Sequence, residues 1–376
     1  MKIAWLSDLD LIGSGYFNLS IPLCEGLTKK GHEVKSAALG YHGQEHNYNF
    51  SLIPANTMQE ALAIITNLYS LWKFDVMIVA LDIPIQEQIL RMMKEKPPFK
   101  YVGIMPVEAD PLCLSWAMAI MQMDKQFVIS QFGVEELHKI GITGAEHIQL
   151  GIDTVSWRLP TKEEKKQVRD VMGFDDETWA VLIVADNQER KNLSHAMMAF
   201  AEFAKNKPNV KLVLVTREYN PIGWRLRDFA QELGISNQLI VFERGMAFRE
   251  LWSIYAGCDM FMLTSKAEGL GLPLMEAMAM GLPTIATNCT GMSELLADGR
   301  GILVDYDYIH RDPFGNGKRY WIDRKDLLDK LEGIYDGTIN TETAVKKARE
   351  YVETRTWEIA IDQLDAGLQK LMEKTS

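Results

Sequence analysis

The sequence predicts an α/β protein of two doubly wound domains. Short apolar runs rich in Val, Ile and Leu alternate with helical segments along the chain, a pattern typical of βαβ units on a parallel sheet. These runs form two series separated by a polar, charged segment, and 376 residues are enough for two domains with full cores. We therefore expect two separate parallel sheets.

The first series contains five expected strands: KIAWLS, HEVKSAAL, FDVMIVAL, KYVGIM and QFVIS. The second series follows LPTKEEKKQVRDVMGFDDET and contains WAVLIVA, VKLVLVT, QLIVFE, CDMFMLT, LPTIATN and GILVDY. Gly151 and Pro160 bracket a connector, GIDTVSWRLP, where we place the hinge. The chain ends in a predicted helix with a single apolar stripe, formed by Trp357, Ile361, Leu364, Leu368 and Leu371.

Composition argues against a nucleic-acid-binding protein, a membrane-spanning protein and a protein held by zinc or disulfides. A net charge of -11 argues against a nucleic-acid groove, and no apolar run approaches the length of a membrane span. The start MKIAWLSDLD is interpreted as a first strand and not as a signal peptide, which favours the cytoplasm. The four cysteines lack the spacing of a zinc cluster or a disulfide framework, so we expect buried reduced thiols at Cys24, Cys113, Cys258 and Cys289.

The stretch KAEGLGLPLMEAMAMGLPTIATN, residues 266–288, carries two acids in otherwise apolar surroundings. Glycines loosen the backbone before Pro273, so a helix should begin near Leu272 and stop at Gly281. Glu268 then stands in the loop before the helix and Glu276 one turn inside it. Both lie near a helix N-terminus, whose free N–H groups attract an anion, typically a phosphate.

Two other loops follow expected strands. After the first strand, Gly13 and Gly15 permit close backbone approach before a helix that we expect to begin near Asn18. After the first strand of the second domain, Arg190 and Lys191 stand at the start of a helix. Facing α/β domains normally bind their ligand at the carboxyl ends of their strands, so these loops are candidate binding loops.

The stretch EGLGLPLMEAMAMGLPTIA resembles the E-x7-E signature of retaining glycosyltransferases of the GT-B fold, in particular the nucleotide-sugar-dependent group called GT4, or glycosyl transferases group 1. The stretches GSGYFN, VISQFGVEEL, GIDT, RKN and FMLTSKAEGLG agree in order, so the resemblance covers essentially the whole chain. It implies two Rossmann-like domains facing a cleft. Residues 1–153 would form the acceptor-side domain, with a C-terminal helix at 355–376 packing back on it, and residues 154–354 the nucleotide-sugar domain.

The resemblance also implies roles for residues. In that family the second glutamate hydrogen-bonds the ribose hydroxyls, the first faces the donor sugar, and an Arg/Lys pair neutralises the diphosphate. Carried over, these become Glu276, Glu268, and Arg190 with Lys191. The implied donor-binding set further contains Gly13, Gly15, Gly271, Leu272, Pro273, Leu274 and Arg217.

The implied reaction is transfer of a hexose, with retention, from a UDP-, GDP- or ADP-linked sugar to a saccharide, a lipid-linked or a small-molecule acceptor. A carboxylate can accept hydrogen bonds from both hydroxyls of a ribose, and Glu268 can lie close to the positive charge that develops at the anomeric carbon. Arg190 and Lys191 can stabilise the departing diphosphate, so neither a metal nor a cofactor is expected. The motif Asp8-x-Asp10 could imitate a metal-binding acidic pair, but we interpret it as shaping its loop or meeting the acceptor.

The chain departs from the family pattern in two places. Many members have an Arg about five residues before the Lys, where this chain has Asp186. Many also have a His in the first domain, where this chain has GIMPVEADPL. Glu108, Asp110 and Asp8 are therefore the acceptor candidates, and His195 is expected to be structural.

Three other functions fit parts of the pattern: a nicotinamide-dependent oxidoreductase, a nucleotide-sugar epimerase and a non-catalytic sugar-nucleotide sensor. The oxidoreductase is disfavoured because GSGYFN lacks the third glycine of the dinucleotide fingerprint. Membrane contact by the basic residues Arg91, Lys94, Lys96 and Lys100 is a further alternative, but a solvated helix end explains them better in an acidic domain.

Overall fold

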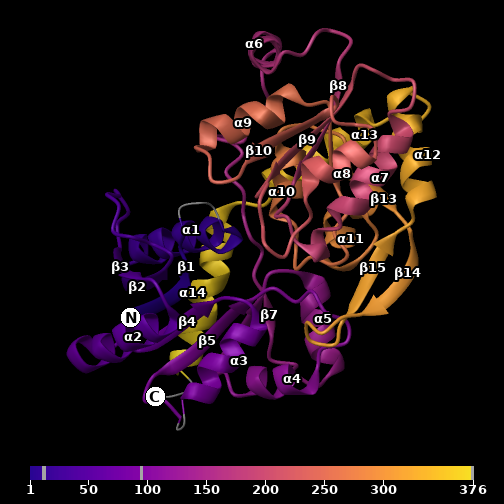
Figure 1. Cartoon of the computed structure of the whole chain (residues 1–376). Coiled ribbons are helices and arrows are strands. Elements are labelled where there is room, and N and C mark those ends of the chain that lie inside the picture. The colour runs from indigo at the N-terminus through magenta and orange to yellow at the C-terminus, as the bar shows by residue number, and fades with distance from the viewer. Residues whose placement is uncertain (11–13, 94–95, 374–376) are drawn as a thin grey trace. The chain divides into compact units, whose positions relative to one another are not determined.

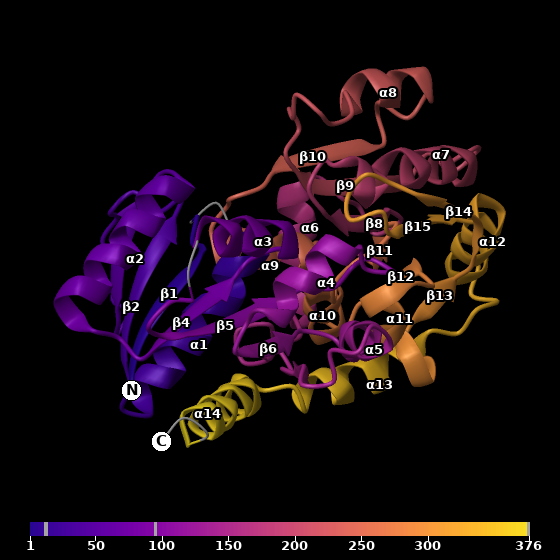
Figure 2. The ribbon, with the colours of Figure 1, turned by 90° about the horizontal axis from the view of Figure 1, so that it is seen from below.

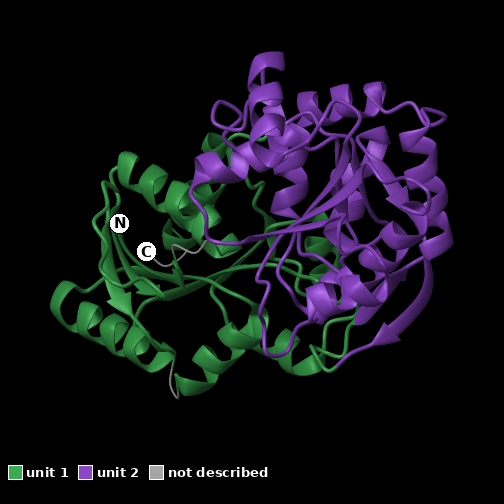
Figure 3. Ribbon diagram, turned by 45° about the horizontal axis from the view of Figure 1, so that its top comes forward, with its two compact units in different colours: residues 1–151, 313–317, 355–376 green, residues 152–312, 318–354 purple. Residues whose placement is uncertain are grey.

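The computed structural model describes residues 1–10, 14–93 and 96–373 and divides into two compact units. Unit 1 consists of residues 1–151, 313–317 and 355–376, and unit 2 of residues 152–312 and 318–354, as coloured in Figure 3. Each unit is built on its own parallel sheet, as the two series of apolar runs predicted.

Unit 1 contains a seven-stranded parallel sheet in the order β3-β2-β1-β4-β5-β6-β7 (Figure 1). All five expected strands are present, whereas β3 and β7 were not predicted. The strands are β1 Lys2–Asp8, β2 Glu33–Leu39, β3 Ser51–Ala55, β4 Val76–Ala80, β5 Lys100–Met105, β6 Lys125–Val128 and β7 Glu146–His147. The helices are α1 Gly15–Lys29, α2 Met58–Trp72, α3 Ile83–Met92, α4 Leu114–Met121, α5 Gln131–Lys139 and α14 Trp357–Glu373.

The C-terminal helix α14 packs on α1 of unit 1, so the implied return of this helix to the N-terminal domain is confirmed. Figures 1 and 2 show the two helices side by side. A Cβ on Gly26 would lie 2.2 Å from the Ile361 side chain, so glycine allows the close approach. An ion pair and a hydrogen bond flank this contact, with Lys30 Nζ 2.7 Å from Asp362 and His32 Nε2 2.8 Å from Asp365 Oδ1.

Unit 2 contains a six-stranded parallel sheet in the order β10-β9-β8-β11-β12-β13 and a separate hairpin of β14 and β15. The six expected strands are confirmed, and the hairpin was not predicted. The strands are β8 Trp179–Val184, β9 Val210–Thr216, β10 Leu239–Glu243, β11 Met260–Leu263, β12 Thr284–Thr287, β13 Ile302–Val304, β14 Tyr306–Arg311 and β15 Lys318–Ile322. The helical elements are α6 Lys162–Met172, η1 Glu189–Lys191, α7 Leu193–Phe203, α8 Leu226–Glu232, α9 Phe248–Gly257, α10 Leu272–Ala279, α11 Thr290–Leu296, η2 Ala297–Gly299, α12 Arg324–Tyr335 and α13 Glu342–Glu353.

Two expected helix starts differ from the structure. Helix α1 begins at Gly15 and not near Asn18, because the Ser14 side chain caps it by accepting the Phe17 N–H at 3.1 Å. Arg190 and Lys191 lie not in α7 but in the 3₁₀ turn η1 before it. Asn192, at a left-handed φ of 58°, separates η1 from α7.

The remaining expectations concern two undescribed residues, the cysteines and membrane-spanning helices. Gly13 and Lys94 lie outside the described residues. All four cysteines are free thiols; three are buried, as expected, and Cys113 is half-buried. Within the described ranges, no helix has both the length and the apolar character that crossing a membrane requires.

Candidate active site

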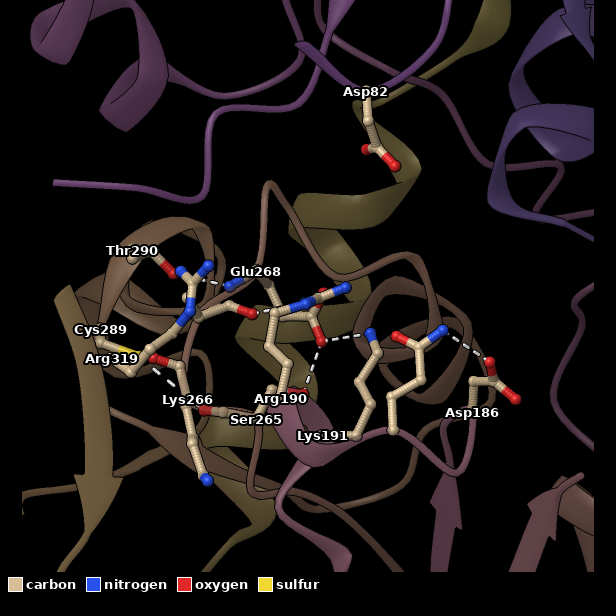
Figure 4. A network of polar contacts seen from close by, with 12 residues as sticks. Asp82, Asp186, Arg190, Lys191, Ser265, Lys266, Glu268, Cys289, Thr290 and Arg319 are labelled. Atoms are coloured by element: carbon tan, nitrogen blue, oxygen red, sulfur yellow. Dashed lines mark hydrogen bonds and ion pairs between the residues drawn. The ribbon is translucent and has the colours of Figure 1, made fainter. Parts of the chain in front are cut away.

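The candidate site lies in unit 2, at the carboxyl ends of the neighbouring strands β8 and β11. Strand β8 leads through a short loop to η1, which carries Arg190 and Lys191. Strand β11 leads to the loop of residues 264–271, which carries Glu268 and continues into α10. Because parallel strands end at the same edge of a sheet, the two loops meet there (Figure 4).

Glu268 is the centre of this contact. Lys191 Nζ donates to its Oε1 at 2.5 Å, Arg190 Nη1 to its Oε2 at 2.9 Å, and Ser265 Oγ to its Oε1 at 2.5 Å. Burial alone would raise the pKa of this carboxyl, but the charges of Lys191 and Arg190 outweigh burial and hold it at about 2. Glu268 is therefore ionised at every physiological pH.

Main-chain hydrogen bonds fix the two loops against each other. The Lys266 N–H donates to the Arg190 carbonyl at 2.8 Å, and Arg190 Nη1 donates to the Ala267 carbonyl at 2.6 Å. The Glu268 N–H donates to Thr290 Oγ1 at 2.9 Å, which ties the loop to the start of α11. The catalytic candidates are thus held by backbone as well as by charge.

Glu276 stands one turn inside α10, as the sequence predicted, in a different environment. The Tyr255 hydroxyl of α9 donates to Glu276 Oε2 at 2.7 Å. Burial raises the pKa of Glu276 to about 7, although the Tyr255 hydrogen bond acts in the opposite direction. Near neutral pH this carboxyl is therefore partly protonated.

The start of α10 supplies the glycine and helix N-terminus expected from the sequence. Gly271 caps the helix at a φ of 109°, a backbone region that residues with a Cβ rarely adopt. Leu272 and Pro273 are half-buried, whereas Leu274 is completely buried. Leu272 and Pro273 can therefore meet a ligand, and Leu274 belongs to the core.

Arg217, expected among the donor-binding residues, pairs with Asp186. Its Nε donates to Asp186 Oδ1 at 2.7 Å, and Arg244 Nη1 lies 3.5 Å from the same oxygen. Burial acts to raise the pKa of Asp186, but hydrogen bonds and charge from Arg217, with the charge of Arg244, keep it below its ordinary value. Many members of the family that this chain resembles have an Arg at this position. Here it is an acid, flanked by two arginines that directly follow β9 and β10.

The remaining sequence-predicted residues belong to unit 1. Asp8 ends β1, where its Oδ1 accepts the Asp10 N–H at 3.1 Å, and Gly15 is the first residue of α1. Glu108 and Asp110 lie in the loop after β5. Glu136 of α5, a buried carboxyl that was not predicted, interacts with Asp110. Burial raises the pKa of Glu136 and Asp110 adds to the rise, against the opposing effect of Lys139.

Sequence reasoning missed several residues of the unit 2 site: Tyr255, Ser265, Arg244 and Thr290. Arg244 had a usable signal, because it directly follows an expected strand. Tyr255 lies in a run that is typical of a buried helix and had none. Among residues 1–10, 14–93 and 96–373, no three His, Cys, Asp or Glu side chains are grouped as metal ligands would be.

Comparison with known proteins agrees with the family resemblance of the sequence. The family model described as "Glycosyl transferases group 1" matches residues 164–311, from α6 to the end of β14. This segment contains Arg190, Lys191, Glu268 and Glu276.

Two curated relatives match over part of the chain. A D-inositol 3-phosphate glycosyltransferase from Paenarthrobacter aurescens is 24% identical over 57% of this chain and 49% of its own length. A GDP-mannose-dependent alpha-(1-6)-phosphatidylinositol monomannoside mannosyltransferase from Mycolicibacterium smegmatis is 29% identical over 43% of each protein. The matched stretches thus span about half, or less, of these relatives.

A solved structure matches over the full length. Sucrose-phosphate synthase from Thermosynechococcus elongatus superimposes with a TM-score of 0.77 at 17% identity, covering 100% of both chains. At this identity the likeness shows the fold, which is GT-B.

Proposed function

We propose that the chain is a glycosyltransferase of the group 1 family, whose model matches residues 164–311, and that it transfers a sugar from a nucleotide-diphosphate sugar to an acceptor, with retention and without a metal. The observation that carries the proposal is the convergence of Arg190 and Lys191 on Glu268 beside the N-terminus of α10. Two cations, a helix N-terminus and an ionised carboxylate are the groups that diphosphate departure from an anomeric carbon requires.

The phosphate-binding half of the site consists of Arg190, Lys191 and the first turn of α10. In the free protein both cations pair with Glu268. A diphosphate would give both side chains a further anionic partner. Arg190 can bind it bidentately while Lys191 acts as a point charge. At the start of α10 the N–H groups of Leu274 and Met275 bond to the Gly271 carbonyl and Pro273 has no N–H, so the main-chain donors available to a ligand there are those of Gly271 and Leu272.

Glu268 and Glu276 have different work in this proposal. Since the pKa of Glu268 is about 2, it cannot serve as a proton donor, and it acts as a fixed negative charge beside the developing oxocarbenium ion. Glu276 accepts hydrogen bonds from the two ribose hydroxyls, which makes it a binding group. Arg217 and Arg244 extend the positive edge toward the nucleotide.

The names of the two relatives suggest which substrates to test first. GDP-mannose is the donor of one relative, and its acceptor is a phosphatidylinositol mannoside, whereas the other relative is named for inositol 3-phosphate. We therefore propose a hexose donor linked to GDP, UDP or ADP and a hydroxyl acceptor on a polyol or a lipid-linked saccharide. Asp8, Glu108 and Asp110 of unit 1 are the candidate acceptor residues.

Incubation of the protein with radiolabelled GDP-, UDP- and ADP-sugars tests the proposal. We expect release of the nucleoside diphosphate from at least one donor, faster with a suitable acceptor, and markedly slower release in Lys191→Ala. Tight binding without turnover would indicate a sugar-nucleotide sensor. Conversion of the sugar while it stays attached to the nucleotide would indicate an epimerase. Either result would contradict the transferase assignment.

A further inference from the structure

A second lysine, Lys266, is buried directly behind the candidate site. It precedes Glu268 by two residues, is only 2% exposed, and points away from the Glu268 carboxylate, as Figure 4 shows. Its Nζ lies 3.4 Å from the centroid of the Trp321 ring and forms an ion pair with the Glu189 carboxylate. A lysine is rarely buried, so this arrangement requires a reason.

Glu189 connects Lys266 to the phosphate-binding cations. It is the first residue of the 3₁₀ turn η1, whose other two residues are Arg190 and Lys191. The Lys266 N–H also donates to the Arg190 carbonyl at 2.8 Å. Lys266 is therefore joined to η1 through its main chain and through its side chain.

The hairpin of β14 and β15 holds the other side of Lys266. The Tyr320 N–H donates to the Lys266 carbonyl at 2.9 Å. The ring of Trp321 is fixed by its Nε1–H, which donates to His310 Nδ1 at 2.6 Å, and by an edge-on contact with His195 at 4.5 Å between centroids. The aromatic face is thus a rigid platform for the ammonium group.

We propose that Lys266 is a positioning residue, which fixes η1 through Glu189 and so sets the direction of Arg190 and Lys191 toward the donor diphosphate. The inference rests on the proposed function, because it assigns these two cations to the phosphates. Lys266 itself touches no substrate. Trp321 of the hairpin contributes an aromatic face, and the cation–π contact with this face stabilises the charged ammonium group where water is excluded.

A purely structural role does not account for a charge at this position. Burying the Lys266 ammonium costs desolvation free energy, whereas the Glu189 carboxylate is 61% exposed and would stay in water if an apolar residue replaced Lys266. An apolar residue would therefore fill the space over Trp321 at least as well as a lysine. What it could not do is bind the Glu189 carboxylate and restrain the short turn that carries the cations.

The test separates phosphate binding from folding. Wild type, Lys266→Met and Glu189→Gln are titrated with GDP, UDP and ADP, and with the matching nucleosides, which lack both phosphates. Both variants should weaken binding of the preferred diphosphate by about tenfold while nucleoside binding changes little. The double variant should lose no more than Lys266→Met alone, because both substitutions break the same link. The melting temperature of Lys266→Met should equal or exceed that of wild type.

Lys207 provides a matched control in the same unit. Its Nζ also pairs with a carboxylate, Glu332 at 2.8 Å, and lies 4.6 Å from the centroid of Phe203. It lies just before the first residue of β9, at the amino end of that strand, whereas the candidate site lies at the carboxyl ends of its strands. Lys207→Met should leave diphosphate affinity unchanged.

Three results would overturn the inference and leave the proposed function standing: wild-type diphosphate affinity in Glu189→Gln, equal losses for diphosphate and nucleoside, or an equal loss in Lys207→Met. Because Glu189 is largely exposed on the surface, its variant remains decisive if Lys266→Met does not fold. Failure of the wild-type protein to bind any of the three diphosphates would instead refute the proposed function, and the inference with it.

Discussion

The loop before α10 and the helix itself each hold one buried glutamate, and the two behave in opposite ways. Glu268 in the loop is 7% exposed and Glu276 in the helix 8% exposed, so their burial is nearly equal. The pKa of Glu268 is about 2, and that of Glu276 about 7. The difference comes from their partners: Lys191 and Arg190 face the first, whereas a neutral Tyr255 hydroxyl faces the second.

This contrast shows that burial alone does not decide how a carboxylate works. A buried acid between two cations is a permanent charge, suited to stabilising positive charge in a transition state. A buried acid beside a hydroxyl gains or loses its proton near neutral pH, so its capacity to accept hydrogen bonds depends on conditions. The loop glutamate should therefore control rate, and the helix glutamate should control affinity.

The largest effect should follow Glu268→Gln. Loss of the fixed charge should lower kcat by on the order of 100-fold, a typical cost of removing one electrostatic contact to a transition state. Nucleoside diphosphate affinity should stay the same or increase, because Arg190 and Lys191 lose a competing anion. Transfer kinetics and calorimetry of the free diphosphate measure the two quantities. A loss of affinity as large as that in Glu276→Gln would show that the division of work is wrong.

Removing one of the cations should have the next largest effect. Lys191→Ala should lower kcat/KM by about 30-fold, corresponding to about 2 kcal/mol, because a buried charged contact to the diphosphate is lost. Unlike Glu268→Gln, this variant should also raise the donor KM. Circular dichroism of the same sample verifies folding. Wild-type kinetics in folded Lys191→Ala would remove Lys191 from the site.

Much of the fold could be predicted because its strands are buried on both faces and form continuous apolar runs. The missed strands lack this signal. Strand β3, Ser51–Ala55, is an edge strand that contains a proline, and β7 has two residues. The hairpin β14–β15 mixes charged and aromatic residues, so neither of its strands shows a clear alternation of apolar and polar residues or a continuous apolar run.

The sequence predicted which candidate residues follow the ends of strands. Arg190, Lys191 and Glu268 follow strands that proved to be neighbours, and parallel strands bring such residues to one edge. Pairing between the cations and Glu268 depends on side-chain direction, which the sequence does not display. Lys266 and Tyr255 were missed for the same reason, since each contacts a carboxylate distant in sequence.

Glu276→Gln should have a smaller and pH-dependent effect. Diphosphate affinity should fall by about tenfold at pH 8, where Glu276 is ionised and can accept both ribose hydroxyls. Wild-type affinity should itself decline as the pH falls through about 7, because protonation removes acceptor capacity. Calorimetry from pH 5.5 to 8.5 would show this decline in wild type and a flatter profile in the variant.

The same substitution should stabilise the free protein. Because the pKa of Glu276 is raised above its unfolded value, ionisation costs folding free energy that is absent well below pH 4.5 and complete above about pH 7. Glu276→Gln removes this cost, so its melting temperature should exceed that of wild type at pH 8 and approach it at pH 4.5. A lower melting temperature at pH 8 would show that the ionised carboxyl is not the unfavourable form.

The smallest expected effect is that of removing metal ions. Two cations and the N-terminus of α10 lie beside the proposed diphosphate position. In the proposed reaction the departing phosphate would meet these positive groups of the protein, so a divalent ion should add little. Transfer rates in excess EDTA and in added magnesium or manganese should differ by less than about twofold.

Complete loss of transfer in EDTA, with recovery on adding either metal, would show instead that Arg190 and Lys191 are insufficient. In that case Asp8 and Asp10 would become the first candidate ligands, and their substitution to Asn should then abolish the recovery.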